Sequence, residues 1–88
     1  LSQNYPNPFN PATTIAFYLP EQADVSLSVY DVSGRLVREL ESGALGAGWH
    51  SAAWDGTAAS GKAAGSGAYF CRLKAGKEII TRKMILLR

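Results

Sequence analysis

The side chains that could perform acid–base or nucleophilic chemistry are few and scattered along this chain. Its 88 residues include one histidine, His50, one cysteine, Cys71, and seven acidic residues. Nucleophilic catalysis needs a base beside a nucleophile, and His50 lies in a strand-like stretch without an acidic neighbour in sequence. Glycoside hydrolysis needs two carboxylates facing each other across a cleft, whereas the acids here lie mostly in turns or beside basic residues. We therefore expect no catalytic residue and no enzymatic activity.

Metal and cofactor sites are equally unsupported by the residue pattern. Asp31 and Asp55 could join a calcium site with loop carbonyls, but two monodentate acids fall short of the several oxygen ligands that calcium prefers. Each aspartate precedes a glycine-containing turn, so capping of the turn is the better interpretation. The lone Cys71 excludes an internal disulfide and a multi-cysteine metal site, and its apolar surroundings in the sequence indicate inert packing. No cofactor is expected.

The elements that would position these residues are short strands. Ile15, Phe17 and Leu19 recur at the two-residue period of a strand, and several later segments repeat that pattern. Turn signals at intervals of roughly 8 to 12 residues separate them, which predicts an all-β, immunoglobulin-like antiparallel β-sandwich of about seven strands. The Cys…Trp…Cys arrangement of antibody domains is missing, so this likeness is architectural. The expected strands cover residues 13–19, 24–30, 35–41, 49–54, 68–74 and 78–87, with glycine-rich loops at 42–48 and 57–67.

Two of these segments carry further expectations. The segment 35–41 also fits a short helix, because its apolar residues allow either period. In segment 78–87 the terminal Met84-Ile85-Leu86-Leu87 is apolar at successive positions. Successive residues of a strand point to opposite faces, so we expect both faces of this strand to be covered.

The segment before the first strand is rich in proline. Pro6, Pro8 and Pro11 lack an amide donor and fix φ, so residues 1–12 must form a rigid lead-in that is extended or turning. Tyr5 and Phe9 would be costly to leave in water, which predicts packing of the lead-in on the sandwich through Tyr5, Pro6, Pro8 and Phe9. The alternative is the end of a linker. We expect a single domain over 1–88, with the sandwich at 13–88, cut from a larger protein.

Charge is distributed unevenly along the chain. Residues 1–71 hold three basic and six acidic side chains, and residues 72–88 hold six basic and one acidic, giving net charges of −3 and +5. This asymmetry indicates either a surface for an anionic partner or a basic edge strand that resists aggregation. Nucleic-acid binding is not expected, because aromatic interleaving and a recognition helix are missing. No apolar stretch is long enough for a membrane span.

The aromatic residues allow a further alternative, because flat exposed rings can stack on sugars in a carbohydrate-binding module. Trp49 and Trp54 are five residues apart, so they point to opposite faces of an unbroken strand, and one of them belongs to the core. This alternation limits the hypothesis without excluding it. The aromatic residues concerned are Tyr18, Tyr30, Trp49, Trp54 and Tyr69.

Several motifs, taken together and in order, resemble a known family. The segment 3–15, Gln-Asn-Tyr-Pro-Asn-Pro-Phe-Asn-Pro-Ala-Thr-Thr-Ile, closely resembles the start of type A C-terminal sorting domains of the type IX secretion system. Further matches are the segments 29–37, 54–56, 66–73 and 81–88. The Trp-Asp-Gly turn at 54–56 is weak alone, because the immunoglobulin-like domain of flagellar hook-capping proteins looks similar there. An assembly domain of that type is the second alternative.

The resemblance implies a noncatalytic C-terminal signal that directs a larger cargo protein through an outer-membrane translocon. It implies a secreted or cell-surface location in a Gram-negative bacterium of the Bacteroidetes or related lineages, reached through the periplasm. The implied partners are the translocon, a sortase-like peptidase and anionic lipopolysaccharide. Gly67, Tyr69 and Lys83 match the signal motifs of the family. We further hypothesise that Lys83 contacts an acidic partner together with Arg82 and Arg88, because charge clusters in the last strand.

Overall fold

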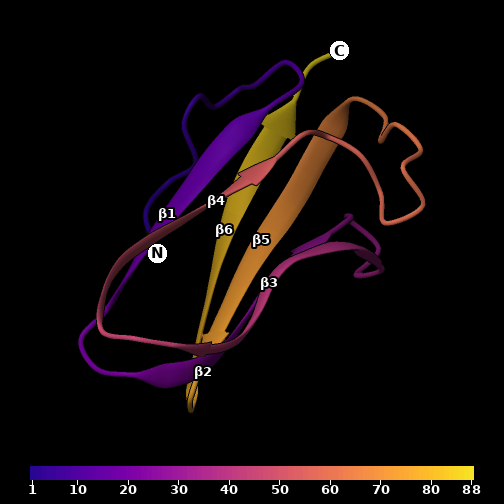
Figure 1. The fold of residues 1–88 in the computed structure, drawn as a ribbon. Coiled ribbons are helices and arrows are strands. Elements are labelled where there is room, and N and C mark those ends of the chain that lie inside the picture. Colours follow the sequence, from indigo (N-terminus) through magenta and orange to yellow (C-terminus); the bar gives the residue numbers. More distant parts are fainter.

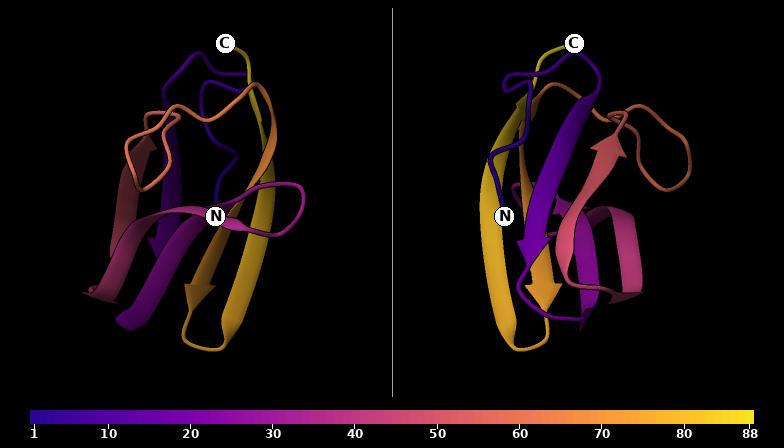
Figure 2. Two further views of the ribbon diagram at one scale, coloured as in Figure 1. Left: turned by 90° about the vertical axis from the view of Figure 1, so that its right-hand side faces the viewer. Right: turned by 60° about the vertical axis from the view of Figure 1, so that its left-hand side comes forward.

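The computed structural model describes all 88 residues and contains six β-strands and no helix. It therefore has no helix that is long and apolar enough to span a membrane. The strands form two antiparallel sheets, β1–β4 and β3–β2–β5–β6, which face each other as the layers of a sandwich (Figure 1, Figure 2). The immunoglobulin-like all-β fold is therefore confirmed, with six strands in place of about seven. Their bounds are β1 Thr13–Leu19, β2 Ala23–Tyr30, β3 Leu36–Leu45, β4 Gly48–Trp54, β5 Gly67–Ala75 and β6 Glu78–Leu86.

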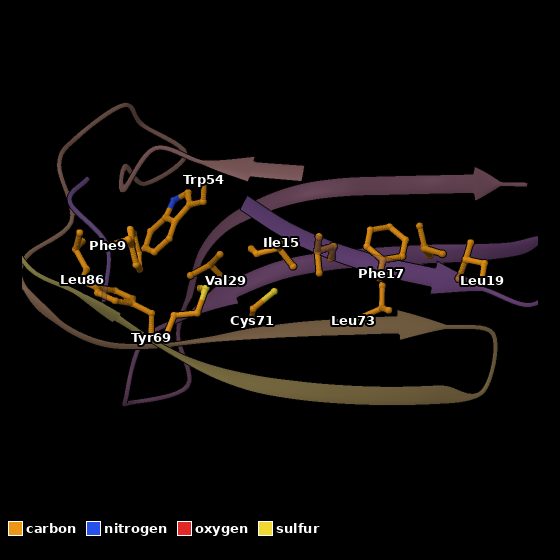
Figure 3. Packing of buried hydrophobic residues seen from close by; sticks show 13 residues of the cluster. Phe9, Ile15, Phe17, Leu19, Val29, Trp54, Tyr69, Cys71, Leu73 and Leu86 are labelled. Carbon is orange, nitrogen blue, oxygen red and sulfur yellow. The ribbon is translucent and has the colours of Figure 1, made fainter. Parts of the chain in front are cut away.

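The core follows from the strand alternation. Ile15, Phe17 and Leu19 point inward from β1. The same alternation buries Val25, Leu27 and Val29 of β2 and Tyr69, Cys71 and Leu73 of β5. Thirteen apolar side chains, from both sheets and from Phe9 of the lead-in, fill the interior (Figure 3). Phe9, Trp54 and Tyr69 lie together at one end of this core, whereas Phe17, Leu19 and Leu73 lie at the other (Figure 3). Trp54 is fully buried and Trp49 is 68% exposed, so the prediction that they face opposite ways is confirmed.

One predicted loop is wrong. The segment 42–48 was expected to be a glycine-rich loop, but β3 continues to Leu45 and only Gly46–Ala47 separates it from β4. The reason is pairing with β2, because Ala23 lies opposite Leu45 and Ser26 lies opposite Ser42. The register between β2 and β3 shifts at two places, between Leu27 and Ser28 and between Val29 and Tyr30. The same pairing makes residues 36–41 a strand, where a helix was the alternative.

The lead-in packs along the open side of the sandwich, between the edges of β1 and β6 (Figure 2). Tyr5 exchanges two backbone hydrogen bonds with Thr14, whereas Phe9 donates to the Ile85 carbonyl and accepts from the Leu87 amide. Phe9 is buried as predicted. The packing predicted for Tyr5, Pro6 and Pro8 is wrong at the level of side chains: Tyr5 is 79% exposed and both prolines are exposed.

A buried polar contact, and not the Tyr5 ring, holds the lead-in against the sandwich. Asn4 is buried in its place, and its Nδ2 donates to Thr13 Oγ1 at 3.0 Å and to the Pro6 carbonyl at 3.1 Å. The Thr13 hydroxyl also donates to that carbonyl. Backbone pairing turns the Tyr5 ring outward, and this buried hydrogen-bonded group anchors the lead-in instead.

Candidate recognition surface

Two residues of the predicted signal, Gly67 and Tyr69, lie at the start of β5 and serve the fold. The Tyr69 ring is buried 5.2 Å from the Trp54 ring, and its hydroxyl donates to the Gly65 carbonyl at 2.7 Å. Gly67 has φ of +148°, and a Cβ there would meet nothing within 4 Å. Glycine is favoured at that φ for its backbone freedom, since no close neighbour requires it.

Arg88 is bound to the protein itself. Its guanidinium donates to the carbonyls of Gly56 and Ala64, and its backbone amide donates to Ser66 Oγ at 2.9 Å. Gly56 has φ of +77°, and a Cβ there would lie 2.9 Å from Arg88 Nη2 and from the Pro11 carbonyl oxygen. The Trp-Asp-Gly turn therefore holds the C-terminal residue and the lead-in together. We call this region, formed by Phe9, Trp54, Gly56, Tyr69 and Arg88, the latched end.

The two aspartates considered as calcium ligands cap turns. Asp31 accepts from the amides of Ser33 and Arg35 and from the Ser33 hydroxyl, which lowers the pKa of its carboxyl to about 2. Asp55 accepts from the amide and hydroxyl of Thr57, and the hydroxyl contact is the main reason that its pKa is lowered. No group of three potential ligands that could hold a metal ion is present.

His50 and Cys71 are likewise accounted for by packing. His50 Nε2 lies 2.7 Å from the Gly46 carbonyl oxygen, and its ring stacks on Phe17 at 5.4 Å. Cys71 is buried in the core, and the burial raises the pKa of its thiol to about 12. Neither residue has a nucleophilic or basic side chain as a hydrogen-bond partner.

Lys83 differs from the other two predicted cations. It lies on β6 opposite Phe70 and directly precedes the inward-facing Met84. Its backbone carbonyl accepts a hydrogen bond from Gln3 Nε2 at 2.9 Å. Its own side chain is exposed and has no ion-pair partner. The neighbouring Arg82 side chain points to the opposite face of β6, and its Nε donates to the Leu1 carbonyl at 3.1 Å. Of the three cations predicted from the sequence, only Lys83 is wholly free.

The structure adds two cations that the sequence hypothesis omitted. Arg72 and Lys74 alternate with the buried Cys71 and Leu73, so they share the outer face of the four-stranded sheet with Lys83. The Arg72 guanidinium lies 4.9 Å from the centre of the Tyr30 ring on β2. We call Arg72, Lys74 and Lys83 the basic face. The sequence signal that would have found it is the same alternation that identified the core of β5.

The only ion pair of the protein joins Arg35 to Asp31 at 3.2 Å in the β2–β3 turn. None of the three cations of the basic face forms an ion pair, although Asp24 lines the same shallow pocket as Lys74. Three unpaired positive charges on a flat sheet surface attract anionic groups by long-range electrostatics. The chemistry available here is recognition of negative charge.

The hairpin of β5 and β6 is uncovered at its turn. There a cavity of about 510 Å³ lies between the end of β1 and the start of β6, with Leu19, Leu73 and Ile80 in its lining. Ile79 is 59% exposed and Ile80 is 40% exposed. We call this region, with Leu19, Leu73, Ile79, Ile80 and the turn at 76–77, the open end. The prediction that both faces of the last strand are covered is wrong, because Met84 and Leu86 are buried on one face, whereas Ile85 is only half-buried and Leu87 is 52% exposed.

The fold and this surface together define an immunoglobulin-like module with a basic β-hairpin. The FlgD Ig-like domain family matches residues 4–78, and the chain belongs to that family. The basal-body rod modification protein FlgD of Escherichia coli K12 is 40% identical over 58 residues, which are 65% of this chain and 25% of that protein. The chain thus corresponds to a minor part of the curated relative.

Three solved structures, from two bacterial species, show the same fold. PorZ, described as an essential bacterial surface component of the type IX secretion system of Porphyromonas gingivalis, matches 97% of this chain and 11% of its own, with a TM-score of 0.69 and 25% identity. Dimeric latent PorU of the same organism matches 96% of this chain and 9% of its own, with a TM-score of 0.71 and 24% identity. FlgD of Pseudomonas aeruginosa matches 84% of this chain and 57% of its own, with a TM-score of 0.66 and 27% identity.

Proposed function

We propose that this chain is a noncatalytic sorting domain that directs a larger cargo protein through a type IX outer-membrane translocon. The supporting observation is the likeness over 97% of the chain to a domain of PorZ, a surface component of such a system. The motifs from segment 3–15 to segment 81–88 point the same way. In this proposal the domain reaches the surface of a Gram-negative bacterium through the periplasm, and it performs no chemistry of its own.

The basic face is the part of the domain that we propose the transport machinery reads. Arg72, Lys74 and Lys83 are exposed, share one sheet face and lack carboxylate partners. Their partner is an acidic surface of the translocon or the anionic lipopolysaccharide to which cargo is joined by a sortase-like peptidase. Gly67, Tyr69 and Arg88 act indirectly in this proposal, because they keep the hairpin in shape.

The test is export of a reporter. The 88 residues are fused behind a fluorescent protein with a periplasmic signal in Porphyromonas gingivalis, and surface fluorescence is measured in parent and translocon-deficient strains. We expect surface signal in the parent strain only. Replacing Arg72, Lys74 and Lys83 together by Glu is expected to abolish it. Lys62→Glu on the exposed 57–66 loop is the matched control and should be exported.

Thermal unfolding of each purified variant separates a lost signal from a lost fold. Deletion of residues 82–88 is a poor test, since it removes the buried Met84 and Leu86. Export of the triple Glu variant at the parent level would refute the role of the basic face. Surface delivery of the parent fusion in the translocon-deficient strain would refute the sorting function.

An assembly role of hook-capping type is the second candidate, and the 40% identity to the Escherichia coli rod modification protein favours it. In this case the chain should replace the corresponding segment of that protein. A chimaera in a strain lacking the protein, scored for swimming on soft agar, tests this directly. Restored motility without type IX export would favour assembly, and motility loss with export would favour sorting.

A further inference from the structure

The outer face of the β1–β4 sheet is chemically unlike the basic face. Tyr18 and Trp49 lie opposite each other in the register, with ring centres 5.5 Å apart and planes inclined by 58°. They are 52% and 68% exposed. The Tyr5 ring joins them from the lead-in, because Tyr5 pairs with Thr14 on the same sheet. We call this face the aromatic strip, and its residues are Tyr5, Thr14, Ala16, Tyr18, Trp49, Ser51 and Ala53.

The polar groups of these rings are free. The buried Trp54 donates its Nε1 hydrogen to the Thr57 carbonyl, and the buried Tyr69 donates its hydroxyl to the Gly65 carbonyl. Trp49 Nε1 and Tyr18 Oη have no such partner within the protein. Two exposed rings of this kind present apolar faces for contact and polar edges for hydrogen bonds.

The aromatic strip carries no charged side chain, so it offers nothing to a strongly ionic ligand. Small residues form the surface of the strip between the rings: Thr14 lies opposite Ala53, and Ala16 lies opposite Ser51. The hydroxyls of Thr14 and Ser51 add two hydrogen-bonding groups to this surface. The strip is therefore neutral, shallow and polar at its edges.

The dimensions of the aromatic strip argue against a folded protein as its occupant. Seven paired residues make a strip about 23 Å long, and two strands make it about 10 Å wide. That area is well below the ~800 Å² that each partner contributes to a standard protein interface. A peptide that adds as a strand would pair through its backbone with the unpaired outer edge of β4, and such pairing would not use the outward-facing rings of the strip. A narrow, uncharged linear chain fits best.

We propose that the aromatic strip binds a neutral, β-linked polysaccharide chain. Pyranose rings with equatorial hydroxyls expose flat C–H faces, which would stack on Trp49 and Tyr18. Their hydroxyls would pair with Trp49 Nε1, Tyr18 Oη and the Thr14 and Ser51 hydroxyls. This binding function is independent of sorting, and it uses residues on the opposite sheet from the basic face.

Titration of the 88-residue chain with cellohexaose, xylohexaose and laminarihexaose by isothermal calorimetry tests the proposal. Saturable binding of at least one of them is expected, accompanied by a change in tryptophan fluorescence from the exposed Trp49. Trp49→Ala and Tyr18→Ala should each weaken binding by about tenfold or more, as expected for aromatic anchors. Val32→Ala, which alters an exposed apolar residue in the β2–β3 turn, and Lys83→Ala should leave it unchanged.

Thermal unfolding should show that both aromatic variants remain folded, since neither ring belongs to the core. Lack of saturable binding of all three hexasaccharides at millimolar concentration would overturn the proposal. So would equal affinity of Trp49→Ala and the parent chain. Sedimentation completes the test: self-association that disappears in Trp49→Ala would assign the strip to a second copy of the chain and would also overturn it.

Discussion

The two ends of the sandwich are built on different principles. At the latched end, the Phe9 and Tyr69 rings lie beside Trp54 (Figure 3), at ring-centre distances of 5.5 and 5.2 Å. The Arg88 guanidinium donates to the Gly56 carbonyl there. At the open end a cavity of about 510 Å³ separates the layers, and Ile79 and Ile80 are exposed. The clustered aromatic rings and the Arg88 hydrogen bonds are thus at one end of the sandwich, and the cavity is at the other.

This difference divides the residues that the sequence predicts to form one signal into two structural groups. Tyr69 and Arg88 belong to the latched end and Gly67 begins β5, whereas Lys83 lies on the exposed basic face. Loss of function after substitution therefore has two physical meanings. At Tyr69 it reports a damaged fold, and at Lys83 it reports a damaged contact.

Trp54→Ala should have the largest effect on the latched end. Trp54 is fully buried, contacts two aromatic rings and donates to the Thr57 carbonyl at 2.8 Å. Removal of such a ring costs about 3 to 5 kcal/mol of unfolding free energy. Urea denaturation measures the loss, and Trp49→Ala on the same strand is the control, expected within about 1 kcal/mol of the parent. Equal losses in the two variants would contradict the assignment of the core.

Gly56→Ala tests the junction of turn, lead-in and C-terminus. The added Cβ meets Arg88 Nη2 and the Pro11 oxygen at 2.9 Å, in addition to the strain of φ at +77°. We expect a loss of about 2 to 3 kcal/mol, the sum of backbone strain and displacement of Arg88. Gly61→Ala is matched in φ, at +87°, with nothing within 4 Å, so it should lose only the strain, about 1 kcal/mol. A similar loss at both glycines would show that the junction is not tightly packed.

Arg88→Ala should have a smaller effect, about 1 to 2 kcal/mol, because it removes two charge-assisted hydrogen bonds to backbone carbonyls at a partly exposed site. Lys83→Ala should change stability by less than about 0.5 kcal/mol, since its side chain is exposed and unpaired. Chemical denaturation compares the two. If Lys83→Ala were the more destabilising, the division between latch and accessible face would be wrong.

Cys71 provides the mildest probe, because alkylation of its thiol reports opening of the sandwich without altering the core beforehand. Burial raises its pKa from 9.0 to about 12, so the folded protein retains the unreactive thiol at pH 8. Iodoacetamide labelling, followed by mass spectrometry, should be negligible in the parent and fast in urea. Rapid labelling of the native parent chain would contradict the burial.

The same shift contributes to the alkaline pH dependence of stability. Above pH 9 the unfolded chain releases the thiol proton before the folded chain does, so stability should fall as pH rises from about 9 toward 12. Cys71→Ser removes this titration and should flatten the dependence over that window. An unchanged slope in the serine variant would assign the dependence to other groups.

Alternation made much of the fold predictable. The inward sets of β1, β2 and β5 follow from a two-residue period, and Trp49 and Trp54 separate by the same rule. The course of β3 through Gly43 could not be read in this way, because glycine signals a loop until a partner strand supplies hydrogen bonds. Arg72 and Lys74 could have been included in the site, since they alternate with residues already assigned to the core.

The sequence by itself determined the strands other than the second half of β3, the immunoglobulin-like class, the buried Phe9 and the concentration of positive charge after residue 71, because these depend on side-chain type and local period. Only the tertiary structure decided which cations are free. Arg88 is bound because residues 56 and 64, far away in sequence, present carbonyls to it, and Tyr5 is exposed because Asn4 and Thr13 supply the buried contact instead. Contacts between residues distant in the chain depend on sheet pairing and layer packing, which a local pattern does not encode.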